Sequence, residues 1–143
     1  MQTVSFQEAV TAIVKKDPRF QPEAYEFIRD ALEYTIKKTR KARRSEPTDI
    51  PTGELLDGIR LYALKEFGPM AVTVLDFWGV RTTGDFGHLV FGLVEAGVFS
   101  KTDNDTLDEF RKGYSFEEAF FDPFRPRNKQ SNANPTQGVE LPI

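Results

Sequence analysis

The stretch FGPMAVTVLDFWGVRTTGDFGHLVFGLVEAGVFSKT, residues 67–102, decides the fold that the sequence predicts. Its pattern indicates a short helix over 70–78, a tight turn, and a longer helix that ends near residue 96. Gly79 suits the left-handed cap that ends a helix, and Thr82 with Asp85 three residues later resembles a capping box. This order of elements is typical of helix–turn–helix and winged-helix domains, whose second helix often lies in a DNA groove.

The longer helix of this stretch lacks the side chains that read DNA. A recognition helix presents polar and basic side chains to base edges and phosphates. Here large apolar residues and three glycines dominate, the only charges are Asp85 and Glu95, and His88 is the one other large polar residue. We therefore expect this helix to be buried in the core or against a partner rather than to lie in a groove.

The chain before this stretch predicts three further helices. Ser5 begins the first with a capping box, and Pro22 is well placed to begin the second. The second helix closes in a run of basic residues, where cations are favoured by the helix dipole, and a Pro-containing linker follows over 45–51. The third helix runs from about Thr52 to Phe67, where a Gly-Pro pair stops it.

Residues 98–114 have two interpretations. In the first, 98–102 form a strand and 110–116 alternate as a return strand would, which gives a small β-hairpin. In the second, Leu107 and Phe110 belong to one helical turn because they are three residues apart. Ser115 then begins a short helix with a second capping box.

The predicted fold is mainly α, a single helical domain over residues 1–124. An N-terminal helical hairpin (1–44) and the linker precede a winged-helix-like three-helix unit (52–124), on which the hairpin packs and which carries the small β-hairpin in the first interpretation. Residues 125–143 are rich in Asn, Gln, Pro and Ser and are expected to be a disordered tail.

The composition limits the chemistry that the chain can perform. Its 143 residues include no cysteine, which excludes disulfides, thiol nucleophiles and Cys-ligated metals, and its net charge is −3. The N-terminus has no basic segment followed by an apolar one, so we expect no signal peptide, and no apolar run approaches the ~20 residues that span a bilayer. These features favour a soluble, cytoplasmic protein with no membrane partner.

Two segments are candidates for binding. The first is the basic end of the second helix, which could hold nucleic acid through its phosphates, although a solvated helix end explains the same run. Its residues are Lys37, Lys38, Arg40, Lys41, Arg43 and Arg44. The second is FEEAFFDPF, whose aromatic rings lie among acids and could dock on a protein partner. Its rings are Phe116, Phe120, Phe121 and Phe124.

A further group of aromatic residues lies at the corner between the helices over 70–78 and 82–96. It consists of Phe77, Trp78, Phe86 and Phe91. Aromatic residues at helical spacing most often form a core, so we expect these to pack together at the corner. Part of the group could instead be an exposed patch that binds a partner.

No motif points to catalysis, a metal or a cofactor. DNDTLDE, residues 103–109, lacks the EF-hand spacing, and the sequence has no phosphate-binding glycine loop and no nucleophile elbow. His88 with Asp85 one turn earlier is too small a set for zinc. An enzyme remains an alternative if the fold gathers acids such as Asp57, Asp76 or Asp85 with His88 in a cleft.

Three parts of the chain resemble a small uncharacterised protein family of planctomycete and verrucomicrobial bacteria. They are DPRF with EAYEFIRDALEYT, the run from GELLDGIRLYALKEF through FGHLVFGLVEAGVFSKT, and GYSFEEAF, which together cover roughly residues 17–120 without the basic run and linker. The most specific part is WGVRTTGDFGHLVF, residues 78–91. The resemblance implies a compact single domain, and it implies no activity, cofactor or site residue.

The sequence therefore favours a non-catalytic, cytoplasmic protein-interaction or scaffold module with an unidentified protein partner. This rests on the missing catalytic signature, the apolar helix over 82–96 and the acidic, Phe-rich C-terminal segment. The alternative is a nucleic-acid-associated protein that makes sequence-independent phosphate contacts through the basic end of the second helix.

Overall fold

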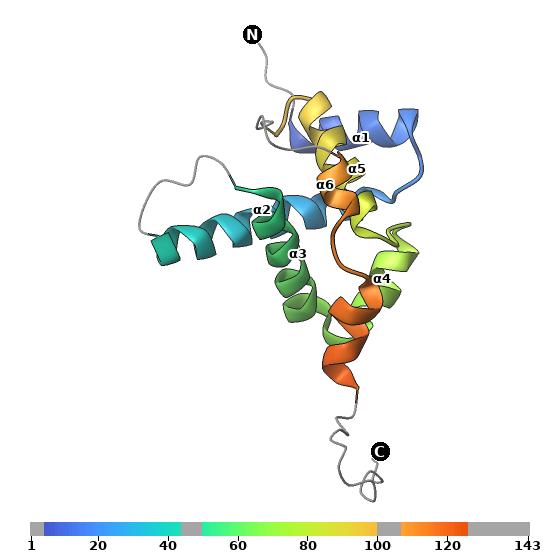
Figure 1. Cartoon of the computed structure of the whole chain (residues 1–143). Coiled ribbons are helices and arrows are strands. Elements are labelled where there is room, and N and C mark those ends of the chain that lie inside the picture. The colour runs from blue at the N-terminus through green and yellow to red at the C-terminus, as the bar shows by residue number, and fades with distance from the viewer. Residues whose placement is uncertain (1–4, 44–49, 100–106, 126–143) are drawn as a thin grey trace, which may run out of the picture.

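The computed structural model describes residues 5–43, 50–99 and 107–125, and these ranges are mainly helical with no strand among them. The mainly helical fold class is thereby confirmed. The elements are α1 (Phe6–Lys16), α2 (Pro22–Arg43), α3 (Thr52–Phe67), η1 (Gly68–Met70), α4 (Ala71–Phe77), α5 (Thr83–Glu95), α6 (Leu107–Arg111), η2 (Glu117–Phe121) and η3 (Asp122–Phe124) (Figure 1). Of the predicted linker only residues 50 and 51 are described, and of the predicted tail only residue 125.

The helix starts agree with the caps in the sequence. At α1, Ser5 Oγ accepts the Glu8 N–H at 3.1 Å and the Glu8 carboxylate accepts the Ser5 N–H at 3.3 Å. At α5, Thr82 and Asp85 make the same reciprocal pair of bonds. Each capping box satisfies N–H groups that the first turn of a helix leaves without a partner. The local sequence therefore contains the signals that begin α1 and α5 at these residues.

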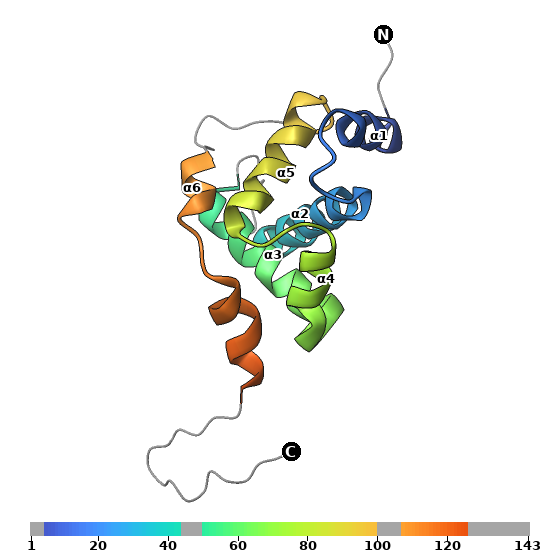
Figure 2. The ribbon, with the colours of Figure 1, turned by 90° about the vertical axis from the view of Figure 1, so that its right-hand side faces the viewer.

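α5 lies inside the bundle. Figure 2 shows it between α1 and α6, and it also packs on α2. The buried side chains of α5 form one continuous hydrophobic core with buried side chains of the other helices. The largest fully buried side chains of this core are Tyr25, Ile28, Ile59, Leu75, Val80, Phe86, Leu89, Leu93, Phe110 and Phe120.

The turn between α4 and α5 is fixed to the loop between α1 and α2. Gly79 has a φ of 93°, and a Cβ at this position would lie 2.5 Å from the carbonyl oxygen of Arg19. The Gln21 N–H donates to the Trp78 carbonyl at 3.0 Å. Two loops that are distant in sequence thus pack backbone against backbone, which glycine permits because it has no side chain and tolerates positive φ.

The return strand in the first interpretation of 98–114 is wrong. Residues 107–111 form α6, so the helical-turn alternative is confirmed. Val98 and Phe99 form a bend in which both N–H groups donate to the Leu93 carbonyl, and residues 100–106 lie outside the described residues.

Apolar and polar residues alternate over 110–116 for a reason other than a strand. Each apolar residue of this segment packs at its own place in the tertiary structure. Phe110 lies against Gly87 of α5, where a Cβ would be only 2.8 Å from it. The Tyr114 hydroxyl donates to the Leu56 carbonyl at 2.6 Å, and the Phe116 ring lies 5.5 Å from that of Phe86. Because each of these contacts is made with another element, apolar residues can occur at every second position of this segment although it forms no strand.

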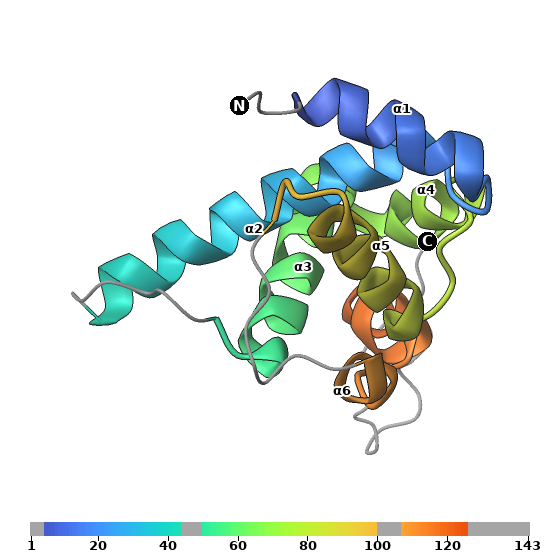
Figure 3. The ribbon, with the colours of Figure 1, turned by 90° about the horizontal axis from the view of Figure 1, so that it is seen from above.

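Two features of the shape position the candidate sites. The C-terminal part of α2 extends beyond the bundle, as Figures 1 and 3 show. η1, α4, η2 and η3 lie together at the end of the molecule opposite α1. Within the described ranges, no helix has both the length and the apolar character needed to cross a membrane.

Candidate functional site

α5 is the helix that the sequence predicts in the position of a recognition helix, and it does not present a basic face. Its buried residues include Phe86, Leu89, Val90 and Leu93. The Asp85 carboxylate is used as a cap, since it accepts the N–H groups of Arg81 at 2.9 Å and Thr82 at 3.2 Å. The start of α5 is covered by α6, where Arg111 lies over Gly84. α5 is therefore part of the core in this structure.

The Phe-rich C-terminal segment divides into inner and outer rings. Phe120 has no exposed surface, and its ring lies 5.0 Å from that of Phe116, which packs in turn on Phe86. Phe121 and Phe124 are 48% and 47% exposed. The inner rings hold the segment to the core, which leaves Phe121 and Phe124 as the rings that a partner can reach.

Two residues of neighbouring elements are exposed in the same way. Met70 in η1 is 55% exposed and Phe77 at the end of α4 is 77% exposed. Because η2 contacts η1, α4 and η3, the elements that carry these four side chains lie together at one end of the molecule. We call Met70, Phe77, Phe121 and Phe124 the exposed apolar surface; they are the exposed large hydrophobic side chains of the described residues.

The expectation that Phe77 belongs to an aromatic core is wrong, and the reason lies in α4. Trp78 is partly buried against Phe27 and Phe67, but Phe77 points away from the core. Positions 71, 75 and 78 form one apolar stripe and positions 70, 74 and 77 form a second. A helix of seven residues that packs on one side buries only the first stripe, with Ala71 and Leu75 fully buried. The second stripe, at positions 70, 74 and 77, is therefore the sequence feature that indicates an exposed apolar face.

Acidic side chains accompany the exposed apolar surface. The elements over 68–77 and 117–125 carry four exposed acids, which are Asp76, Glu117, Glu118 and Asp122. They carry one cation, Arg125, which bonds to Glu117 at 2.7 Å and to Asp122 at 3.0 Å. This end of the molecule therefore combines apolar side chains with a negative charge.

The basic end of α2 is described only in part. Lys37 and Lys38 are exposed, and Lys38 Nζ lies 5.7 Å from the ring centroid of Tyr34. The predictions for Arg40, Lys41, Arg43 and Arg44 fall outside the side chains that the structure describes.

Aromatic rings lie beside Lys38, which the sequence did not indicate. The rings of Tyr34 and Tyr62 are 5.4 Å apart, and Lys65 Nζ lies 6.0 Å from each. Rings and cations together suit stacked nucleobases. However, burial raises the pKa of Tyr62, and the nearby carboxylates of Glu66, Asp30 and Glu33 raise it further. Carboxylates near these rings oppose the approach of a polyanion.

His88 lies in a cavity of about 730 Å³ formed by α1, the loop after it, α2 and α5. Asp17 and Arg19 of the loop line the same cavity and form an ion pair, with Nε–Oδ1 at 3.0 Å and Nη2–Oδ2 at 2.8 Å. The hydrogen bonds from Arg19 lower the pKa of Asp17. The sequence did not predict this grouping, because it depends on the tertiary packing of α1 and α2 on α5.

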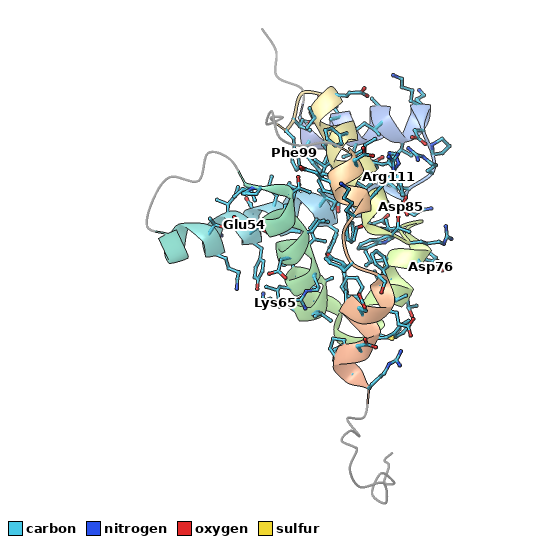
Figure 4. The ribbon with its side chains drawn as sticks, viewed as in Figure 1. Glu54, Lys65, Asp76, Asp85, Phe99 and Arg111 are labelled. Atoms are coloured by element: carbon cyan, nitrogen blue, oxygen red, sulfur yellow. The ribbon has the colours of Figure 1, made fainter. Side chains whose placement is uncertain are left out.

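The acids that could have joined His88 in a catalytic cleft are placed elsewhere. Asp57 bonds to Arg60 on α3, and Asp76 bonds to Arg81 at 2.7 Å. Asp85 caps α5. Figure 4 shows Asp76 on one side of the α4–α5 turn and Asp85 on the other. The structure brings His88 together with Asp17 instead.

The described ranges contain no group of three or more His, Asp or Glu residues that could hold a metal ion. No family model, curated protein or solved structure matches the chain. The resemblance to the planctomycete and verrucomicrobial family thus stays a prediction. The function is argued below from the surfaces of the molecule itself.

Proposed function

We propose that this chain is a non-catalytic, cytoplasmic protein-interaction module that binds its partner through the exposed apolar surface. The observation that carries the proposal is the exposure of Met70, Phe77, Phe121 and Phe124 on elements that contact one another. Full burial of an exposed side chain of this kind contributes about 1.5–3 kcal/mol, and about half of that applies to Phe121 and Phe124, which are already half covered. Exposed aromatic residues and Met are also the side chains that are enriched in protein interfaces.

The charge of this end indicates the chemistry of the partner. The four exposed acids outnumber Arg125 and Arg81, the two cations that pair with them, and this excess favours a partner surface that combines Lys or Arg with apolar side chains. An amphipathic helix with a basic edge has this composition, and it can lay its apolar face on exposed rings. We therefore propose a basic, amphipathic protein segment as the partner.

A photo-crosslinking experiment tests this proposal. A photoreactive phenylalanine replaces Phe121 or Phe124 in the full chain, and the matched control carries it in place of Thr11, which is exposed on α1. In extract of the native cells, we expect a discrete crosslinked protein from positions 121 and 124 and not from 11. Substituting both Phe121 and Phe124 by Ser should abolish the complex, because both substitutions remove apolar contact area without touching the core.

Two results would contradict the proposal. If the photoreactive residue at position 11 crosslinks to the same protein with the same yield, the exposed apolar surface has no preference for that protein. A concentration-dependent dimer in sedimentation velocity that the double Ser variant abolishes would make the partner a second copy of the chain, which does not have the proposed basic chemistry at this surface.

Sequence-independent binding of nucleic acid by the end of α2 is the second candidate function. The exposed Lys37 and Lys38, the second of which lies beside Tyr34, support it, and the carboxylates near Tyr62 count against it. The test titrates the protein with duplex DNA and structured RNA at low and moderate salt. Binding should weaken steeply with salt and be lost when Lys37, Lys38, Arg40 and Lys41 become Gln.

A matched control separates a specific site from the overall charge. It changes Lys15 on α1 and Lys112 after α6, both of which are exposed, to Gln. Equal loss in this control would remove α2 as the binding site, and no binding at low salt would leave the run as a solvated helix end. The winged-helix-like arrangement of α3, α4 and α5 stays a prediction, and neither candidate function depends on it.

A further inference from the structure

Two residues carry all the sulfur of this chain. The sequence has no cysteine, and its two methionines are Met1 and Met70. Met1 lies outside the described residues. Peroxides oxidise a methionine thioether to the sulfoxide, and methionine sulfoxide reductases reverse the reaction. Within the described ranges, Met70 is therefore the position at which this reversible modification can occur.

Met70 is open to solvent and lies outside the core. It is 55% exposed, and it does not belong to the partly buried hydrophobic residues that pack against the core. The adjoining α4 makes its core contacts through Ala71 and Leu75, which are fully buried. At Gly68, two residues before Met70, an added Cβ would also face open space. An oxidant in solution can thus reach the sulfur in the folded chain, and the sulfoxide would not enter the core.

The position of Met70 connects its oxidation to partner binding. Met70 is part of the exposed apolar surface, where η1 contacts the η2 segment that carries Phe121. Oxidation converts a flexible apolar side chain into a polar one. A partner that covered the sulfoxide would have to remove water from it, which is unfavourable unless a new hydrogen bond forms. Oxidation adds no charge, so the acids at this end would act on the partner as before.

We propose that Met70 is a redox modification site, whose oxidation by hydrogen peroxide releases the partner from the exposed apolar surface. This inference rests on the proposed function, because it assigns a regulation to the same surface. The thioether sulfur attacks one peroxide oxygen, the O–O bond breaks and an S–O bond forms. The proton on the transferred oxygen passes to the departing hydroxide, which leaves as water. The sulfur is oxidised and the peroxide is reduced, and a reductase that uses thiols reverses the change.

The first measurement is the rate at which hydrogen peroxide oxidises Met70, followed by mass spectrometry of the peptide that contains it. The full chain is compared in its folded state and in concentrated urea. The two rates should agree within about threefold, because the side chain is exposed in both states. Urea denaturation of the oxidised protein should give the midpoint of the untreated protein. Strong protection in the folded state, or a lower midpoint after oxidation, would overturn the proposal.

The second measurement uses a fluorescent peptide of Leu and Lys at amphipathic helical spacing as the probe for a basic, amphipathic partner. The peptide contains no residue that peroxide oxidises. Its anisotropy should report binding to the untreated full chain and a loss of binding when Phe121 and Phe124 become Ser. Oxidation of the protein should weaken binding by about 3–10-fold, which corresponds to about half of the burial energy of one such side chain. Treatment with methionine sulfoxide reductase should restore it.

Two variants assign this effect to Met70. Met70→Gln has a polar side chain of similar length and should bind the peptide like the oxidised protein. Met70→Leu should bind like the wild type and be unaffected by peroxide, although Met1 is still present. The weaker binding should come from faster dissociation, with the association rate and its salt dependence unchanged, because no charge changes.

The outcomes separate this inference from the proposed function. If the untreated protein does not bind the peptide, the proposed function is wrong, and the regulation is wrong with it. If the untreated protein binds but neither oxidation nor Met70→Gln weakens binding, the redox inference alone is wrong. The same conclusion applies if Met70→Leu loses binding on treatment with peroxide as the wild type does.

Discussion

Phe110 of α6 lies directly against the backbone of Gly87 in α5, so closely that a Cβ at position 87 would be 2.8 Å from Phe110 Cβ and Cγ. Phe110 itself has no exposed surface. A second contact holds the same two helices together, since the Thr83 hydroxyl donates to the Phe110 carbonyl. The absence of a side chain at 87 is thus the condition under which α6 can cover α5.

Gly87→Ala should destabilise the fold for this reason. A methyl group here must displace a fully buried ring, and overpacking of a core costs about 1–3 kcal/mol. The matched control is Gly53→Ala in α3, where nothing lies within 4 Å of the added Cβ and a gain of about 0.4–1 kcal/mol is expected. Urea denaturation of both variants measures the difference. Equal midpoints would show that Phe110 does not occupy this position.

Gly79→Ala should be more damaging than Gly97→Ala, although both residues have positive φ, 93° and 84°. At Gly97 nothing lies within 4 Å, so only the backbone strain of about 1–2 kcal/mol applies. At Gly79 the new methyl would also meet the Arg19 carbonyl at 2.5 Å. The difference between the two unfolding free energies therefore measures the contact between the α4–α5 turn and the α1–α2 loop. Equal losses would mean that the two loops do not touch.

The helix boundaries could be predicted because they depend on local signals. The capping boxes at Ser5 and Thr82 and Pro22 at the start of a helix act within a few residues of themselves, and the structure begins α1, α2 and α5 there. The strand interpretation of 110–116 was wrong because its period of two reflects tertiary packing sites. Nothing in the local sequence reveals that Phe110 packs on a glycine of another helix.

The candidate sites could be predicted only in part, for the same physical reason. The Phe-rich segment was identified from composition, but which rings point outward depends on the packing of Phe116 on Phe86. The cavity joins Tyr25, His88 and the Asp17–Arg19 pair, which come from three separate elements. Their proximity depends on the packing of α1 and α2 on α5, and a local sequence pattern does not encode such packing.

Adjacent rings of η2 should differ sharply in their contribution to stability. Phe120→Ala removes a fully buried ring and should cost about 3–5 kcal/mol. Phe121→Ala removes a ring that is 48% exposed and should change the unfolding free energy by about 0.5 kcal/mol or less. Chemical denaturation of the two variants gives this comparison directly. A large loss for Phe121→Ala would place that ring in the core and remove it from the exposed apolar surface.

Tyr114 should make the stability of the protein fall at alkaline pH. Its hydroxyl donates to the Leu56 carbonyl at 2.6 Å, and burial raises its pKa far above the ordinary value of 10.0. Below pH 10 the phenol is protonated in both states, so Tyr114 adds no pH dependence. Above pH 10 the unfolded chain loses this proton while the folded chain keeps it, and the unfolding free energy falls by up to about 1.4 kcal/mol per pH unit.

Tyr114→Phe separates this effect from the other tyrosines. At pH 7 the variant loses one hydrogen bond, which costs about 0.5–1.5 kcal/mol, because the Leu56 carbonyl keeps the hydrogen bond of its helix. Between pH 10 and 11 its unfolding free energy should fall less steeply than that of the wild type. The remaining slope comes in part from Tyr25 and Tyr62, whose pKa values burial also raises. Urea titrations at pH 9, 10 and 11 measure both slopes, and identical slopes would mean that the Tyr114 phenol is as accessible in the folded chain as in the unfolded one.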